Sequence, residues 1–483
     1  MQVDEQVLER TIGRFRERRI LLPTFAQMQN PDTIPQQIKD RLTQIGLWDV
    51  DPVNLFRITW KNEPVEKGGL FGHGNWIEFP AELTGARARI IGLVGKYFPT
   101  GAHKVGAAFG CLIPKLVSGE FDPTRHKAVW PSTGNFCRGG AFDSALVGCT
   151  AVAILPEEMS RERFEWLKRI GAEVIATPGC ESNVKEIYDK CWEIRRTRPE
   201  CIIFNQFEEF GNPVWHYHVT GSMIEEIFGG LSAGHRLAGY VSATGSAGTI
   251  AAGDRLRLLH PEVRVVAAEA LQCPTLYQLG FGGHRIEGIG DKHVPWVHNV
   301  RNTDVVAAID DQQCLSLLRL FNEPAGHDFL SRSLSDDLIR QLPQIGISGI
   351  CNLVAAIKTA KHFDMTGSDV IFTCLTDSAE LYASRLEELT AQEGAFSSEN
   401  ALYSKARYLD GIGADHYREL TYHDRKSLHN FKYFTWVEQQ GRTVEELREL
   451  WQPEFWQRTF AQVHQWDRQI EQFNERSGVL ELL

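Results

Sequence analysis

Short apolar runs alternate with helical patterns along the middle of the chain, from about residue 85 to about residue 380. Runs rich in Val, Ile and Ala are typical of buried strands, whereas apolar residues spaced three or four apart are typical of amphipathic helices. The apolar runs that predict strands lie at 149–156, 172–179, 237–245, 263–270 and 369–377. The segment 160–171 predicts a helix that ends at Gly171. This alternation predicts an α/β fold whose parallel sheets are covered by helices on both faces.

The last part of the chain has a different pattern. From about residue 395 onward the β-branched runs disappear, and aromatic residues, histidines and charged residues dominate. One set of apolar residues recurs at steps of three and four, which predicts an amphipathic helix. Its members are Trp456, Phe460, Val463 and Trp466. We therefore predict a helical extension over 395–483 that packs on the α/β body or on a second subunit.

Composition narrows the class of protein. The chain has 483 residues, 43% hydrophobic and 23% charged, which is typical of a globular protein with about two or three domains. The formal net charge of −11 argues against nucleic acid as a partner. The charged N-terminal segment is unlike a secretory signal, and there is no apolar run of about 18 residues that would span a membrane. Ten scattered cysteines without metal-ligand spacing predict reduced thiols, no bound metal and a cytoplasmic location.

A glycine-rich loop follows the apolar run at 237–245 and precedes a helical pattern. Its residues are Thr244, Gly245, Ser246, Ala247, Gly248 and Thr249. Small residues let the backbone approach an anion closely, and the N–H groups at the start of a helix attract phosphate. The loop matches neither the Walker A pattern nor the GxGxxG fingerprint. A tight strand-to-helix connection would have the same sequence, so both interpretations stay open.

A second polar loop, 132–135, lies between an apolar run and a helical pattern. Ser132, Thr133 and Asn135 supply side-chain hydrogen-bonding groups beside backbone amides. Such a loop can bind a carboxylate or cap the following helix, and capping is the commoner role for an isolated loop.

Lys104 ends the segment "FPTGAHK" (98–104). An isolated lysine after a glycine turn is usually a solvated amine. A lysine amine can also form a Schiff base with a carbonyl, and pyridoxal phosphate needs such an amine together with a phosphate-binding loop. Lys104, the loop 132–135 and the loop 244–249 together meet most of these requirements.

The order of these motifs resembles that of the fold-type-II pyridoxal-phosphate enzymes. This superfamily includes cysteine synthase, cystathionine β-synthase, threonine dehydratase and the tryptophan synthase β subunit. "TGAHK" (100–104) is similar to the Schiff-base lysine motif of the tryptophan synthase β subunit, and "STGN" (132–135) is similar to the substrate-carboxylate loop of cysteine synthases. Further similar segments lie at 205–227, 287–290, 346–349 and 375–381. The similarity covers roughly residues 75–390.

The resemblance implies a role for each matching residue. Lys104 would carry the cofactor as a Schiff base and then act as the base, and His103 would meet the cofactor phosphate. The phosphate loop would be 244–249, Gly288 would line the cofactor face, and Ser378 would meet the pyridine nitrogen. The substrate-binding residues would be Ser132, Thr133, Gly134, Asn135 and Gln206, with Asn135 also bonded to the cofactor 3′-oxygen.

The implied reaction takes place at Cβ of a small amino acid. A neutral serine does not keep the pyridine nitrogen protonated, so prompt loss of a β-leaving group is favoured over transamination. The resulting aminoacrylate either accepts a second small nucleophile (β-replacement) or yields ammonia and a keto acid (β-elimination). The expected substrate is an O-activated L-serine, L-cysteine or a relative. The alternatives are a serine/threonine-type ammonia-lyase and, less favoured, a non-catalytic scaffold subunit.

The resemblance also implies how the domains are organised. We expect an N-terminal extension over 1–60, and a large cofactor-binding domain formed by 61–110 and 226–394. A small domain over 111–225 would close over the substrate, and 395–483 would be the C-terminal extension. A homodimer is expected. Two features depart from the cysteine synthases. Phe136 would reshape the pocket. The segment 291–293 is either a charged loop tip or the place where Lys292 or His293 recognises an anionic or polar substituent on the substrate or on a second substrate.

Overall fold

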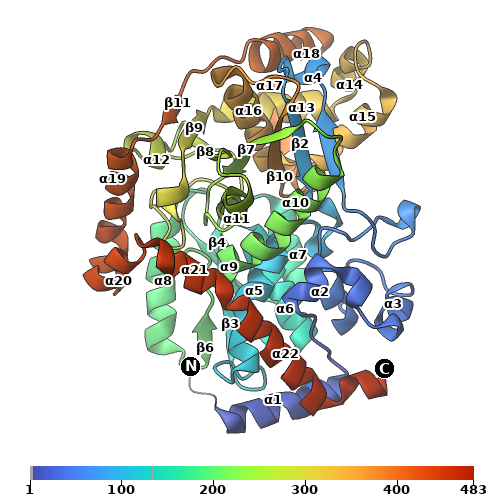
Figure 1. The fold of residues 1–483 in the computed structure, drawn as a ribbon, viewed down its shortest axis with the longest axis vertical. Helices are drawn as coiled ribbons and strands as arrows, with labels where there is room; N and C mark the ends of the chain where they lie inside the picture. Colours follow the sequence, from blue (N-terminus) through green and yellow to red (C-terminus); the bar gives the residue numbers. More distant parts are fainter. Residues whose placement is uncertain (1–3, 133) are drawn as a thin grey trace.

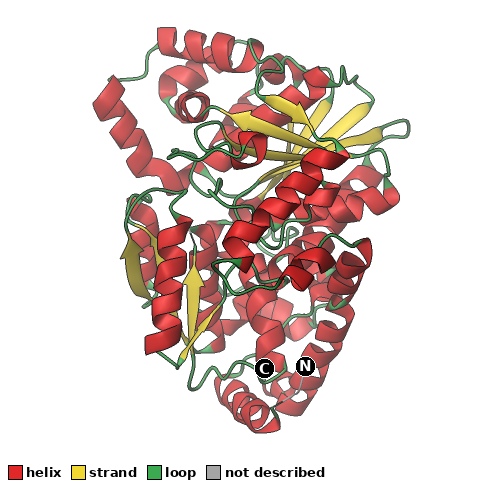
Figure 2. Ribbon diagram, turned by 90° about the vertical axis from the view of Figure 1, so that its left-hand side faces the viewer, coloured by secondary structure: helices red, strands yellow, loops and turns green. Residues whose placement is uncertain are grey.

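The computed structural model describes residues 4–132 and 134–483 and contains two separate β-sheets. Helices cover both sheets, and Figure 2 shows the larger sheet at the upper right and the smaller one at the lower left. This arrangement confirms the predicted α/β fold with parallel sheets covered by helices, and the helical C-terminal region is present.

The larger sheet has seven strands in the order β1-β2-β10-β7-β8-β9-β11. The strands are β1 (Trp76–Phe79), β2 (Arg89–Val94), β10 (Asp369–Leu375), β7 (Arg236–Ala243), β8 (Arg264–Ala270), β9 (Val305–Ile309) and β11 (Tyr417–Glu419). The five inner strands are parallel, and the two edge strands β1 and β11 are antiparallel to their neighbours. Every residue of β10 is buried, which agrees with its mostly apolar sequence, DVIFTCL.

The smaller sheet has four parallel strands in the order β5-β4-β3-β6. They are β3 (Lys127–Pro131), β4 (Thr150–Pro156), β5 (Glu173–Thr177) and β6 (Cys201–Ile203). This sheet lies within the segment predicted as the small domain (111–225). The domain boundaries themselves stay predictions.

Helices connect the strands and pack on the sheet faces (Figure 1). Those between β1 and β11 are α4 (Ala81–Thr84), α5 (Lys104–Val117), α6 (Asn135–Val147), α7 (Arg161–Arg169), α8 (Val184–Thr197), α9 (Gly211–Trp215), α10 (Gly221–Gly230), α11 (Ala252–Leu259), α12 (Thr275–Gln278), α13 (Asp311–Asn322), α14 (Pro324–Leu330), α15 (Asp336–Gln341), α16 (Ile347–His362), α17 (Ala383–Glu393) and α18 (Ser398–Lys405). Nearly all of α16 is buried against the larger sheet. None of the helices in the described part of the chain combines the length and apolarity needed to cross a membrane.

The two ends of the chain pack together at the bottom of Figure 1. The N-terminal helices are α1 (Glu5–Arg18), α2 (Phe25–Gln29) and α3 (Gln36–Leu42), and the last four are α19 (Tyr422–Lys432), α20 (Val444–Glu449), α21 (Pro453–Ala461) and α22 (Val463–Ser477). The rings of Phe15 and Phe473 meet edge to face at 5.1 Å, and the Phe25 backbone N–H donates to Asp467 Oδ1 at 2.7 Å. The C-terminal extension therefore packs on the body and on the N-terminal extension.

The structure corrects two details of the predicted tail. The aromatic stripe lies on two helices rather than one, because α21 ends at Ala461 and α22 begins at Val463. The tail also contributes a strand, since β11 pairs with β9. That strand is three residues long, and its pairing depends on the neighbouring strand rather than on a local β-branched run.

Candidate active site

A pocket lies where loops from the two sheets meet. Its lining comes from the carboxyl ends of parallel strands, since Ser132 follows β3, Gly245 follows β7 and Thr376 follows β10. Ligands in α/β proteins bind at this edge of the sheet. The lining residues are Lys104, Ser132, Asn135, Phe136, Gln206, Phe207, Gly245, Ser246, Gly288, Gly290 and Thr376.

Most of the residues predicted from the sequence meet in or beside this pocket. Seven of them line it: Lys104, Ser132, Asn135, Gln206, Gly245, Ser246 and Gly288. Four others are chain neighbours of lining residues: His103, Gly134, Thr244 and Ala247. Gly248 and Thr249 follow in the same loop. Thr133 lies outside the described residues. Ser378 is buried and does not line the pocket.

Lys104 is the first residue of α5, and its Nζ donates a hydrogen bond to Ser246 Oγ at 3.2 Å. Burial lowers the pKa of this amine to about 8, so a useful fraction is neutral near neutral pH. The backbone at Lys104 is packed tightly against α6. A Cβ on Gly139 would lie 2.7 Å from the Cα of Val105, so only glycine allows this approach. The close helix packing fixes the position of the lysine.

The loop 244–249 is built from small residues that are held in place by neighbours. Asn212 Nδ2 donates to Ser246 Oγ at 3.0 Å, and Gly290 N–H donates to the Thr244 carbonyl at 2.8 Å. A Cβ on Gly248 would lie 1.9 Å from Asn212 Oδ1. The loop leads into a helical turn that starts at Thr249 and continues as α11. Exposed N–H groups at such a start suit a phosphate.

His103 is buried beside Lys104, with Nε2 3.2 Å from Thr376 Oγ1. Burial, together with the neighbouring Lys104 amine, lowers the pKa of His103 well below its usual range, so the ring is neutral. A second histidine, His216, contacts the phosphate-type loop, with Nε2 3.4 Å from Thr249 Oγ1. His216 lies in the segment 205–227 that resembles the family, but it was not among the predicted site residues. The predicted contact of His103 with a phosphate stays a prediction.

Asn135 and Asp377 form a buried pair at the pocket. Asn135 Nδ2 donates to Asp377 Oδ2 at 2.6 Å, and the Tyr382 hydroxyl donates to the same oxygen at 2.8 Å. Asn135 Oδ1 is buried and has no hydrogen-bond partner among the described residues. Burial raises the pKa of Asp377, and Arg163 offsets part of this rise. The sequence "LTDS" (375–378) contains Asp377, but its pairing with Asn135 depends on contacts 242 positions apart in the chain.

The hydroxyl group that lines the pocket after β10 belongs to Thr376 rather than to Ser378. Ser378 lies at the start of a short helical turn, Ala379–Tyr382, and its carbonyl accepts the Leu381 N–H at 3.2 Å. The predicted contact of Ser378 with the pyridine nitrogen stays a prediction, and Thr376 is the second candidate for it.

The substrate-type loop 132–135 is supported from outside by Arg163. A Cβ on Gly134 would lie 1.8 Å from Arg163 Nη1, and Gly134 has a φ of +149°. Arg163 forms an ion pair with Glu287, with Nε 3.2 Å from Oε2, and the other carboxylate oxygen of Glu287 accepts from Arg385 Nε at 2.6 Å. These buried groups position the loop. Within the loop, Ser132 Oγ accepts the Gly134 N–H at 3.1 Å.

The two departures from the family pattern lie in different places. Phe136 lines the pocket and packs edge to face on Trp130 at 5.5 Å, which agrees with its predicted effect on pocket shape. The segment 291–293 does not line it. Lys292 Nζ donates to Asn183 Oδ1 at 3.4 Å, and His293 Nδ1 lies 2.9 Å from Thr435 Oγ1 in the C-terminal extension. These contacts give both side chains structural partners.

These residues fit the requirements of pyridoxal phosphate. Lys104 supplies a partly neutral amine. The loop 244–249 supplies a small-residue anion cradle, and Asn135 Oδ1 is an acceptor without a hydrogen-bond partner in the described part of the chain. A Cβ on Gly288 would meet no atom within 4 Å, so there is open space beside this glycine for a flat ring.

Comparisons with known proteins agree with the fit of these residues to pyridoxal phosphate. Residues 96–327 match the family described as "Pyridoxal-phosphate dependent enzyme". A cysteine synthase of Staphylococcus aureus is 30% identical over 261 residues, which are 53% of this chain and 75% of that protein. The chain belongs to this family of pyridoxal-phosphate-dependent enzymes. It is therefore an enzyme whose cofactor is pyridoxal phosphate, and the resemblance seen in the sequence is confirmed.

Other family members are similar over a comparable length. A probable cysteine synthase of Bacillus subtilis is 29% identical over 59% of this chain and 85% of its own length. The cystathionine β-synthase of Saccharomyces cerevisiae is 26% identical over 62% of this chain and 58% of its own length. The solved structure of an O-ureido-L-serine synthase has a TM-score of 0.56 at 24% identity, covering 67% of this chain and 95% of that one. That structure shares the fold.

Proposed function

We propose that this enzyme catalyses β-elimination or β-replacement on a small β-substituted L-amino acid, such as an O-activated serine or cysteine. The relatives named cysteine synthase and cystathionine β-synthase support this class of reaction. The observation that carries the proposal is the position of Lys104 Nζ. It projects into a pocket between the loop 244–249 and the loop 132–135, and its pKa is lowered to about 8.

Different residues of the pocket have different roles in the proposed reaction. Pyridoxal phosphate, when bound, supplies an electron sink for the carbanion at Cα. Lys104 Nζ accepts the Cα proton, because a base with a pKa near the working pH is effective. Ser132, Asn135 and Gln206 hold the substrate carboxylate beside the loop amides. Phe136 and Phe207 keep bulk water out of the pocket, which protects a reactive intermediate from hydrolysis.

Chemistry at Cβ is favoured over transamination by the residues that follow β10. Thr376 and Ser378 are neutral hydroxyls, and neither can hold a proton on a pyridine nitrogen. The Asp377 carboxylate, the charged group in this segment, is bonded to Asn135 and Tyr382. The electron sink is then weak, so early departure of a β-leaving group is the favoured outcome.

The proposal is tested by turnover of a substrate panel. Purified holoenzyme is mixed with O-acetyl-L-serine, O-phospho-L-serine, L-serine, L-threonine and L-cysteine, each with and without sulfide or L-homocysteine. A product that requires the nucleophile indicates replacement, whereas ammonia and a keto acid formed without it indicate elimination or an ammonia-lyase. Lys104→Ala should abolish turnover, and Lys190→Ala, a surface lysine paired with Glu193, should not. Cofactor-loaded enzyme that converts none of these amino acids would contradict the proposal.

We also propose a homodimer in the cytoplasm. Sedimentation equilibrium of the holoenzyme tests the first statement, and a monomer at all concentrations would contradict it. Localisation of the tagged protein in its host tests the second.

A further inference from the structure

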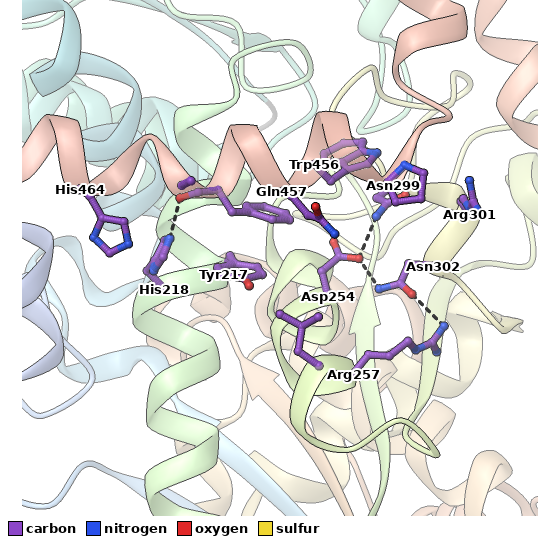
Figure 3. A pocket seen from close by; sticks show the side chains of 14 residues that line it. Tyr217, His218, Asp254, Arg257, Asn299, Arg301, Asn302, Trp456, Gln457 and His464 are labelled. Carbon is purple, nitrogen blue, oxygen red and sulfur yellow. Dashed lines mark hydrogen bonds between the residues drawn. The ribbon is translucent and has the colours of Figure 1, made fainter.

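A second pocket lies outside the active site, between the α/β body and the C-terminal helices α21 and α22 (Figure 3). Its volume is ≈ 570 Å³, which is within the usual range for small-molecule sites. The body contributes Tyr217, His218, Asp254 and Asn299, and the extension contributes Trp456 and Phe460. The pocket therefore exists only because the extension packs on the body.

One end of the pocket is polar and offers acceptors. Asp254 Oδ1 accepts hydrogen bonds from the side-chain amides of Asn299, at 2.9 Å, and of Asn302. Asn299 Oδ1 is buried and has no hydrogen-bond partner among the described residues. None of the described residues donates to Asp254 Oδ2, and this oxygen of the half-buried Asp254 is accessible from the pocket. Figure 3 shows both side chains at the same end of the pocket. A group that satisfies these oxygens must be a hydrogen-bond donor.

The cationic side chains at this end, Arg257 and Arg301, donate to protein acceptors, and Arg257 Nε is buried without a hydrogen-bond partner among the described residues. Arg257 donates through Nη1 to Asn302 Oδ1 at 2.8 Å and through Nη2 to Asp304. Arg301 donates to the Trp451 carbonyl at 3.0 Å. Burial raises the pKa of Asp254 to about 7, because the two amides and Arg257 offset only part of the lost hydration. A ligand cation would supply the missing stabilisation.

The other end of the pocket is aromatic. Tyr217 stacks on Phe460 with ring centroids 3.9 Å apart, and Trp456 is buried beside them. His218 Nε2 lies 2.8 Å from the Phe460 carbonyl, and burial lowers the pKa of His218 to about 4. The histidine is therefore neutral and does not repel a cation.

The segment that supplies Tyr217 and His218 is a π-helical turn, η6 (His216–Thr220), between α9 and α10. Such turns are rare and occur frequently at functional sites. The same turn carries His216, whose Nε2 lies 3.4 Å from Thr249 Oγ1. One short segment thus borders both the second pocket and the active-site loop.

We propose that this pocket binds a small primary ammonium compound with an aromatic or branched apolar body. The ammonium group donates to Asp254 Oδ2 and Asn299 Oδ1, and the apolar body lies against Trp456 and Phe460. A carboxylate in the same place would face the Asp254 carboxylate, and a ligand without a strong donor would leave the buried Asn299 Oδ1 unsatisfied. This site is separate from the cofactor pocket and does not depend on the reaction proposed for it.

Isothermal titration calorimetry of the full-length holoenzyme tests the proposal with three probes of similar size: 2-phenylethylammonium, 2-phenylethanol and 3-phenylpropionate. We expect saturable binding of the ammonium compound, and binding of the alcohol weaker by about tenfold or more, the loss expected for about 1.4 kcal/mol. The carboxylate should not bind. Asp254→Asn should weaken binding of the ammonium compound by a similar factor. Asp364→Asn, at an exposed carboxylate, should not change its affinity.

A second variant keeps the test decisive if Asp254→Asn fails to fold. Leu258 lines the pocket and is 68% exposed, so Leu258→Trp should be tolerated and should block the opening. Circular dichroism and the melting temperature show whether each variant is folded. No saturable binding of 2-phenylethylammonium would overturn the proposal. So would equal affinity for the ammonium compound and the alcohol, or unchanged affinity in folded Leu258→Trp.

Discussion

The lowered pKa of Lys104 makes a quantitative prediction about cofactor uptake by the apoenzyme. Only the neutral amine attacks the aldehyde of pyridoxal phosphate. Burial lowers the pKa of Lys104 from 10.5 to about 8, and the partner of Nζ, Ser246 Oγ, is uncharged. At pH 7 about a tenth of Lys104 is then neutral, against about 0.03% of an ordinary lysine, a difference of about 300-fold.

The sign of the pH effect follows from the direction of this pKa shift. Because the ammonium form is disfavoured by burial, raising the pH toward 8 increases the reactive fraction, and above about 8 there is little more to gain. The rate of cofactor uptake should therefore rise with pH and level off near pH 8. For an ordinary lysine the rise would continue to above pH 10.

Stopped-flow absorbance measures this rate directly. Apoenzyme is mixed with pyridoxal phosphate between about pH 6 and about pH 10, and Nα-acetyl-lysine under the same conditions serves as the reference amine. Lys104→Ala should show no change in the cofactor absorbance band. An uptake rate that keeps rising through pH 9 in parallel with Nα-acetyl-lysine would refute the argument that burial activates Lys104.

Four further substitutions test other parts of the account. Gly248→Ala should weaken pyridoxal phosphate binding by about tenfold or more, since its Cβ would lie 1.9 Å from Asn212 Oδ1; equilibrium dialysis measures this, and unchanged affinity would contradict the role of the loop. Asp377→Ala should lower the free energy of unfolding by about 3–5 kcal/mol, measured by urea titration, because it leaves buried partners unpaired; a loss below about 1 kcal/mol would contradict this. Thr376→Val and Ser378→Ala discriminate between the two hydroxyls: the variant that shifts the cofactor absorbance band and kcat identifies the residue at the pyridine nitrogen, and no effect from either would exclude both.

The sequence was sufficient for the central strands and for the main site residues. Buried strands such as β10 have mostly apolar sequences. Lys104 and the loops 132–135 and 244–249 occur in an order that is rarely produced by chance. Their meeting in one pocket follows from the rule that the carboxyl ends of parallel strands lie at one edge of a sheet.

Other features depend on contacts that a single sequence does not reveal. The three-residue strand β11 forms because β9 offers a free edge, and the break between α21 and α22 divides a pattern with continuous helical spacing. Whether Thr376 or Ser378 lines the pocket depends on how the chain turns after β10. The second pocket joins residues about 200 positions apart, and no local pattern marks such a site.

The central claim, that Lys104 carries the cofactor, is tested most directly by reduction and peptide mapping. Borohydride treatment of the holoenzyme should remove the visible cofactor band, and mass spectrometry of the digest should place the reduced pyridoxyl group on the peptide containing Lys104. Lys104→Ala should carry no such label. Labelling of a different lysine, or a purified protein without a reducible cofactor band after incubation with pyridoxal phosphate, would contradict the account.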